Sequence, residues 1–206
     1  MENEKFLLHL EQTLAQVVRQ QEAICSELVN MRERVDALSE PKAGPPSSAP
    51  TPTELVRFLD RFRAGEALGK VTTKAWIEVS DVACVKGGLR VVAQREGMHA
   101  RLLADCIRAH GGTPNYELPE AVREEALRRS SDPSRGDAAK VLEFVQQVGD
   151  TEKALAPIYA MADRLDHDPE TQSLLRTIAQ DERATLEFFQ QACKLLNSSP
   201  AKPGAQ

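Results

Sequence analysis

The chain has 206 residues, of which 41% are hydrophobic and 28% charged, a balance typical of a globular protein rich in helix. Its formal net charge is −5, so no overall positive field would attract a nucleic-acid backbone. Aromatic residues make up only 4%, which argues against the stacking platforms that bind single strands. We therefore expect no nucleic-acid partner.

Other features of the composition concern the membrane and the redox environment. No apolar run is long enough to cross a bilayer, and the first residues lack the basic and apolar regions of a signal peptide. The four cysteines, Cys25, Cys84, Cys106 and Cys193, are dispersed and form no Cys-x-x-Cys pair. These features predict a cytoplasmic protein with reduced thiols and no membrane partner.

Residues 1–39 carry an apolar heptad pattern. Apolar positions alternate by three and four from Leu7 to Leu38, with Gln21 as a polar intrusion. A stripe this narrow needs a partner helix to bury it, so the pattern predicts a coiled coil and a homo-oligomer. The alternative is an amphipathic helix that folds back on its own domain. An unidentified protein partner is a third option.

Two further segments are expected to lack a packed core. Residues 40–53 are rich in proline and serine and predict a linker that holds the coiled coil away from the rest of the chain. Residues 197–206 predict a disordered tail. The folded domain is therefore expected at 54–196.

The pattern within 54–196 is helical, with almost no strand signal, and predicts an all-α domain. Thr53 is a plausible N-cap for the first helix, and Gly111 and Gly112 followed by Pro114 form a stop after the second. Pro169 is placed to open the last helix. The expected long helices cover 54–80, 87–110, 137–165 and 169–196, with a short surface helix at 119–129.

An internal repeat relates the second and fourth of these helices. The segment "GLRVVAQREGMHARLL" aligns with "LLRTIAQDERATLEFF", which pairs Glu96 with Glu182. The same offset pairs Glu66 in the first helix with Glu152 in the third. Two helical hairpins related in this way would pack as a pseudo-symmetric four-helix bundle with a long crossover connection.

A bundle built in this way would bury four carboxylates near one another. Such a cluster is tolerated only when its members are protonated or bound by cations. His99 follows Glu96 by one helical turn, so a carboxylate and an imidazole share one face. The pair predicts either a metal site or an ordinary surface pair, and the repeat favours the metal site.

These residues resemble those of the ferritin-like superfamily, and "AGEALG" with "REGMHARLLADCIRAHGGTP" is most similar to its rubrerythrin-type members. The resemblance covers 54–196. It implies a ferritin-like four-helix bundle with a non-haem di-iron centre that takes iron as Fe²⁺ or Fe³⁺, with manganese as an alternative metal. It also implies an oxidoreductase of the ferroxidase or peroxide-reducing kind.

The resemblance further implies the metal ligands. They would be Glu66 from the first helix, Glu96 and His99 from the second, Glu152 from the third and Glu182 from the fourth. Thr185 stands where the symmetric pattern has a second His, so the shell of a second iron would be short of one protein ligand. The alternative hypothesis is a metal-free ferritin-like scaffold that self-associates through the N-terminal coiled coil.

Overall fold

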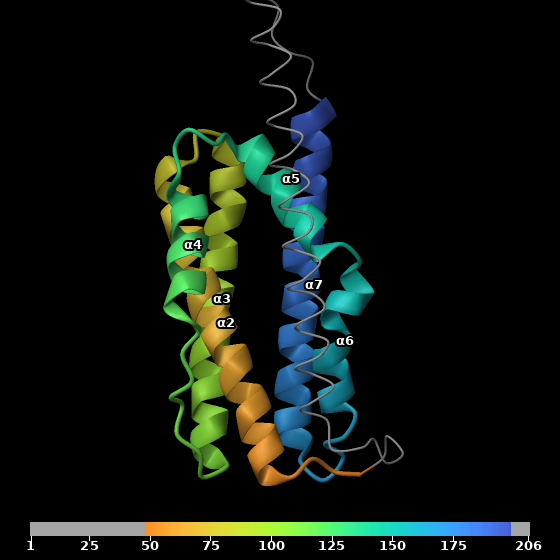
Figure 1. Ribbon diagram of the computed structural model, residues 1–206. Coiled ribbons are helices and arrows are strands. Elements are labelled where there is room, and N and C mark those ends of the chain that lie inside the picture. The colour runs from red at the N-terminus through yellow and green to blue at the C-terminus, as the bar shows by residue number, and fades with distance from the viewer. Residues whose placement is uncertain (1–47, 199–206) are drawn as a thin grey trace, which may run out of the picture. The chain divides into compact units, whose positions relative to one another are not determined.

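Six helices and no strands make up residues 48–198, the part of the chain that this computed structural model describes (Figure 1). The helices are α2 (Pro52–Val79), α3 (Ala83–Ala109), α4 (Glu120–Ser131), α5 (Asp137–Val148), α6 (Thr151–Ala162) and α7 (Pro169–Ser198). The all-α prediction is confirmed for these residues. The predicted coiled coil at 1–39 lies outside them, as do most of the predicted linker at 40–53 and of the tail at 197–206.

Helix α2 begins at a capping box. The hydroxyl of Thr51 accepts a hydrogen bond from the backbone N–H of Glu54 at 3.2 Å, and the Glu54 carboxylate accepts one from the backbone N–H of Thr51 at 3.4 Å. Pro52 follows at the first helical position, where its missing N–H costs nothing. The N-cap is therefore Thr51 and not Thr53, and the helix starts earlier than predicted.

Helices α2 and α3 form a hairpin whose members pack closely along their length (Figure 1). Glycines lie at two points of this contact, each against the end of a long side chain of the other helix. A Cβ atom on Gly97 would lie 2.9 Å from Cδ of Lys70, and one on Gly69 would collide with the carboxylate of Glu96. Helix α4 covers the outside of α2 and buries none of its own residues. The hairpin thus presents its remaining face to the other helices.

The predicted third helix at 137–165 is two helices, α5 and α6. Gly149 has a φ of 63°, a left-handed conformation that ends α5. Asp150 then caps α6 by accepting a hydrogen bond from the backbone N–H of Lys153 at 2.9 Å. The prediction of one continuous helix was wrong because a helix stop and a helix start follow each other directly. Both helices pack against α7.

One buried carboxylate connects the α2–α3 hairpin to α5. Asp137 accepts hydrogen bonds from Nε1 of Trp76 at 2.7 Å, from the hydroxyl of Ser80 at 2.8 Å and from the backbone N–H of Val82 at 3.1 Å. A buried carboxylate with three donors is well compensated for its loss of water. Asp137 therefore fixes the start of α5 against the end of α2.

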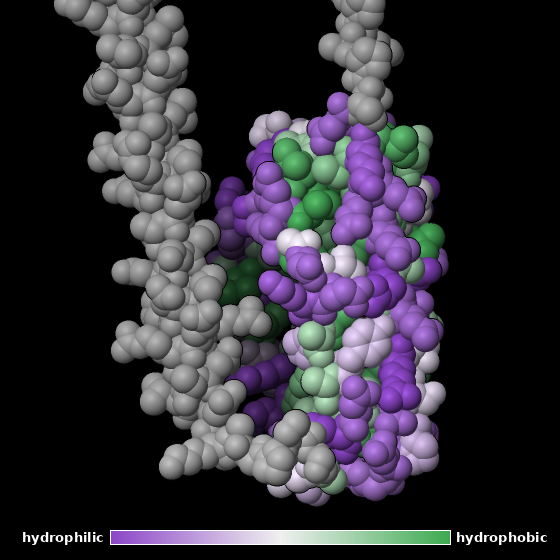
Figure 2. All heavy atoms as spheres, turned by 90° about the vertical axis from the view of Figure 1, so that its right-hand side faces the viewer, coloured by the Kyte–Doolittle hydropathy of each residue, from purple (hydrophilic) through white to green (hydrophobic). Residues whose placement is uncertain are grey.

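Two hydrophobic clusters fill the interior. The first includes Leu59, Leu103 and Leu175, and the second includes Trp76 and Phe189. Each fully buried leucine stabilises the fold by roughly 1.5–3 kcal/mol, so the clusters can offset the cost of polar groups between them. Hydrophilic side chains cover much of the outer face of α5, α6 and α7, with apolar patches among them (Figure 2).

Candidate metal site

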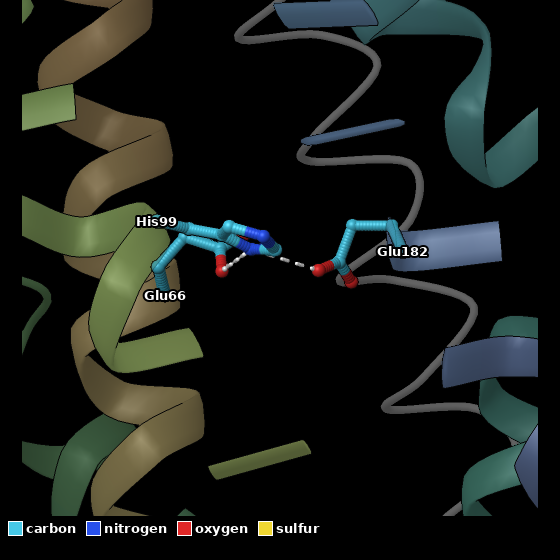
Figure 3. Close-up of side chains that lie close together, drawn as sticks. All are labelled: Glu66, His99 and Glu182. Carbon is cyan, nitrogen blue, oxygen red and sulfur yellow. Dashed lines mark hydrogen bonds and ion pairs between the residues drawn. The ribbon is translucent and has the colours of Figure 1, made fainter. Parts of the chain in front are cut away.

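Three side chains from three helices converge on one point (Figure 3). They are Glu66 of α2, His99 of α3 and Glu182 of α7, and one ligand atom of each lies within 4.8 Å of the others. Nδ1 of His99 is 3.0 Å from Oε2 of Glu66 and 3.3 Å from Oε1 of Glu182. Carboxylate oxygens and an imidazole nitrogen are donors that bind divalent transition metals.

The helical period explains why these polar residues face inward. Glu66 lies two turns after Leu59 and two turns before Thr73, and both of those residues are buried. His99 lies two turns after the buried Val92. The side chains of His99 and Glu66 are 1% and 5% exposed, while that of Glu182 is 18% exposed. The site is therefore enclosed on the side of α2 and α3 and more open at α7.

Glu96 lies beside this cluster, in the space that the missing side chain of Gly69 leaves. Its carboxyl group is within hydrogen-bonding reach of Glu66. Burial, together with the negative charges of Glu66 and Glu182, raises the pKa of Glu96 to about 10. This carboxyl group therefore carries a proton near neutral pH when no cation is bound.

The pKa values of Glu66 and His99 are also shifted by burial and by the neighbouring charges. Burial and the charge of Glu182 raise the pKa of Glu66, against the opposing contact with His99. For His99, burial would lower the pKa, but contacts with Glu182, Glu66 and Asp181 outweigh it and raise the pKa to about 10. Without a cation, the cluster thus holds protons that a metal ion would displace.

Asp181 also belongs to the site, although it was not among the predicted ligands. Nε2 of His99 lies 3.1 Å from Oδ2 of Asp181, and Nε of Arg95 lies 3.9 Å from the other oxygen of that carboxylate. A carboxylate on the far nitrogen of an imidazole orients the ring and makes it a better ligand. The available signal was the position of Asp181 directly before Glu182 on α7.

Glu152 is not brought to the cluster. It lies in the first turn of α6, where its exposed carboxylate pairs with both terminal guanidinium nitrogens of Arg183. The structure therefore gathers Glu66, Glu96, His99 and Glu182 from the predicted ligand set and leaves Glu152 on the surface.

Two oxygen atoms at the cluster lack a hydrogen-bond partner. One is Oε1 of Glu182, whose 3.3 Å contact with His99 lacks hydrogen-bond alignment. The other is the hydroxyl of Thr185, which is 2% exposed and lies one turn after Glu182 on the same face of α7. Buried polar atoms without a partner are uncommon and call for an explanation, such as a ligand.

Comparison with known protein families, with curated proteins and with solved structures found no match for this chain. Within residues 48–198, no second group of three or more His, Cys, Asp or Glu side chains is close enough to hold a metal ion. None of the helices described is long and apolar enough to span a bilayer. The geometry of this cluster is therefore the basis for a functional proposal.

Proposed function

We propose that residues 48–198 form a ferritin-like four-helix bundle, with α5 and α6 together as its third helix, and that this bundle binds iron. Glu66, His99 and Glu182 are the proposed ligands. The observation that carries the proposal is the convergence of two carboxylates and an imidazole from three helices on one enclosed point. Carboxylates are not buried together without protons or a cation to compensate their charge.

The donor set fits such a metal. Oxygen and nitrogen donors without a thiolate suit Fe²⁺ and Mn²⁺. Oε1 of Glu182, buried and without a hydrogen-bond partner, is an atom that a cation would satisfy. The carboxylate of Asp181 lies within hydrogen-bonding distance of Nε2 of His99. Nδ1 is therefore the nitrogen directed at Glu66 and Glu182. The orientation of the ring is thus set before any ion arrives.

Iron at this site would supply the redox chemistry of ferritin-like oxidoreductases, in which O₂ or peroxide oxidises Fe²⁺. The side chains have separate tasks. Glu66 and Glu182 bring the negative charge that retains a cation, and Asp181 holds His99 in place. Without a metal ion, Glu96 keeps a proton next to Glu66. Metal binding that displaces such protons is weaker in acid than near neutral pH.

Anaerobic titration of the full chain with Fe²⁺, with binding measured by isothermal titration calorimetry, tests the proposal. E182Q should weaken binding by more than roughly tenfold, because it removes a charged ligand and leaves the cation undercompensated. E187Q makes the same chemical change at an exposed position of α7 and should bind as the wild type does. Absence of binding by the wild type, or equal binding by E182Q, would contradict the proposal.

A second function is favoured by a different observation. Both ring nitrogens of His99 already lie within hydrogen-bonding distance of carboxylates, so a protonated imidazole would be paired on both sides without a metal. The domain would then be a metal-free scaffold, and the predicted coiled coil at 1–39 would provide self-association. A thermal shift on adding Fe²⁺ or Mn²⁺ separates the two, because only a ligand that binds the folded state raises its stability.

A further inference from the structure

The internal repeat pairs each residue of the cluster with a counterpart in the other half of the domain. Glu96 corresponds to Glu182, Glu66 to Glu152, and His99 to Thr185. A symmetric pair of metal ions would need donors at all of these positions. Of the three positions in the second half, only Glu182 brings a metal-binding donor to the cluster.

The register of α3 against α7 shows which residues could hold a second ion one helical turn away from the first. Gly88 of α3 lies against Phe188, and further along α3 Arg95 lies against Asp181, so the two helices run antiparallel. One turn back from His99 on α3 is Glu96, and one turn on from Glu182 on α7 is Thr185, so these two positions lie at the same height along the antiparallel pair. At that level α7 offers a neutral hydroxyl, which is a weak metal ligand, where a second histidine would be needed.

Glu152 does not complete a second set of donors. The break at Gly149 and Asp150 places it in the first turn of α6, with its carboxylate in solvent and bonded to Arg183. Leu155, three residues later, is the residue of this segment that points inward, with 2% exposure. Leu155 belongs to the first hydrophobic cluster, so this part of α6 directs an apolar side chain, and not Glu152, towards the interior.

We infer that the site takes one divalent transition-metal ion per chain, held by Glu66, His99 and Glu182, and not two. The inference rests on the proposed function and makes it more specific. Glu96 and Thr185 then lie beside a mononuclear centre with two carboxylates and one imidazole, and no pair of ions is bridged by Glu96. The asymmetry comes from two features of the second half, Thr185 and the helix break before Glu152.

Electron paramagnetic resonance with Mn²⁺ as the probe tests this inference on the full chain. The bound fraction should saturate at one ion per chain, with the spectrum of an isolated ion and no exchange coupling. An anaerobic count of bound Fe²⁺ should give the same number. Two ions per chain with a coupled spectrum would overturn the inference and leave the proposed function standing, whereas no uptake of either metal would overturn the proposed function itself.

The number of metal ions bound per chain by two glutamine variants shows which residues are ligands. E152Q should keep one ion per chain at the wild-type affinity, because the carboxylate of Glu152 pairs with Arg183 and binds no metal. E182Q should lose the ion. A fall in the metal count of E152Q would show that Glu152 is a ligand and would contradict the inference.

Discussion

The carboxylate of Glu96 occupies the space in which Gly69 lacks a side chain, so that a Cβ atom at position 69 would collide with it. A glycine in the middle of a helix costs roughly 0.5–1 kcal/mol relative to alanine. Here the glycine leaves room for the carboxyl group of Glu96 on α3 to lie against α2, next to Glu66. The position of Glu96 thus depends on the absence of an atom on the neighbouring helix.

Replacing Gly69 by alanine should therefore destabilise the domain or displace Glu96. Because the atoms that the new Cβ would meet are the far end of the flexible Glu96 side chain, the cost should lie at the lower end of the roughly 1–3 kcal/mol of overpacking, and urea unfolding would measure it. G65A is the matched control, because Gly65 lies on the same helix with no atom within 4 Å of the added Cβ. G65A should gain about 0.5–1 kcal/mol from helix propensity. Equal stability of the two variants would contradict the proposed packing.

A second glycine pair tests the contact between α3 and α7. A Cβ atom on Gly88 would collide with the ring of Phe188, whereas one on Gly87 would meet nothing within 4 Å. G88A should lose about 1–3 kcal/mol because a large aromatic ring must move. G87A should be at least as stable as the wild type in the same denaturation experiment. If G88A behaved like G87A, the register of α3 against α7 would need revision.

The positions of most helices could be predicted from the sequence, because apolar periodicity and proline or glycine signals are local. The break between α5 and α6 was missed although it is also local. Gly149 and Asp150 are a typical C-terminal stop and a typical N-cap, but the apolar pattern continues across them. The α2 cap was misplaced because Thr51 and Thr53 are both acceptable N-caps, and only Thr51 precedes Pro52 and has Glu54 three residues later.

The candidate site was predictable where the residues follow their helical faces. Glu66, His99 and Glu182 share a face with apolar neighbours, and the structure brings them together. Glu152 was placed by the offset of the repeat, which assumes an unbroken third helix, and the break at Gly149 removes that assumption. Asp181 could not be assigned, because its role depends on how closely α3 approaches α7, which sequence periodicity does not determine.

The metal-free domain should become less stable as the pH rises. Glu96 has a folded-state pKa of about 10 and an unfolded value near 4.5, so folding binds a proton above pH 4.5 and stability falls as the pH increases towards 10. The pKa of His99, also raised to about 10, has the same sign: its contribution is complete below about pH 6.5 and is lost as the pH rises towards 10.

E96Q replaces the proton-binding group by a neutral amide and tests this dependence. Urea unfolding at pH 5, 7 and 9 should show a smaller decline for E96Q than for the wild type, with E96Q the more stable of the two at pH 9. E78Q, an exposed substitution on α2, should follow the wild type throughout. A parallel decline of E96Q and the wild type would show that Glu96 is ionised in the folded state.

At low pH, protonation of a different carboxylate, that of Asp60, should reduce the stability of the domain. Its oxygens accept hydrogen bonds from Arg63 at 2.6 Å and from the backbone N–H groups of Asn115 and Tyr116 at 3.0 and 2.7 Å. Burial would raise the pKa of Asp60, but these hydrogen bonds outweigh it and lower the pKa below its usual value. The contribution of Asp60 to stability is therefore present above about pH 4 and is lost as the pH falls through the folded-state value.

D60N should lose roughly 1–3 kcal/mol at pH 7, because it weakens the link between the segment after α3 and helix α2. The difference from the wild type should shrink below pH 4, where Asp60 itself becomes protonated. D105N removes an exposed ion pair with Arg108 and should change stability by less than about 1 kcal/mol. A D60N deficit that stayed constant down to pH 3 would show that the charge of Asp60 is not the cause.

The first residues of the domain determine where the folded unit begins. The sequence predicted a folded unit from residue 54, and the structure places its first stabilising contacts earlier: Thr51 caps α2, and the backbone oxygen of Ser48 accepts a hydrogen bond from Arg164 at 3.2 Å. A shortened chain that begins at Ser48 should therefore unfold cooperatively in urea, whereas one that begins at Thr53 should be less stable by about 1 kcal/mol because it lacks the cap. In the full chain, T51A should show a similar loss, and T53A, at an exposed position in the first turn, should show little. Loss of cooperative unfolding in the chain that begins at Ser48 would mean that residues before it belong to the folded unit.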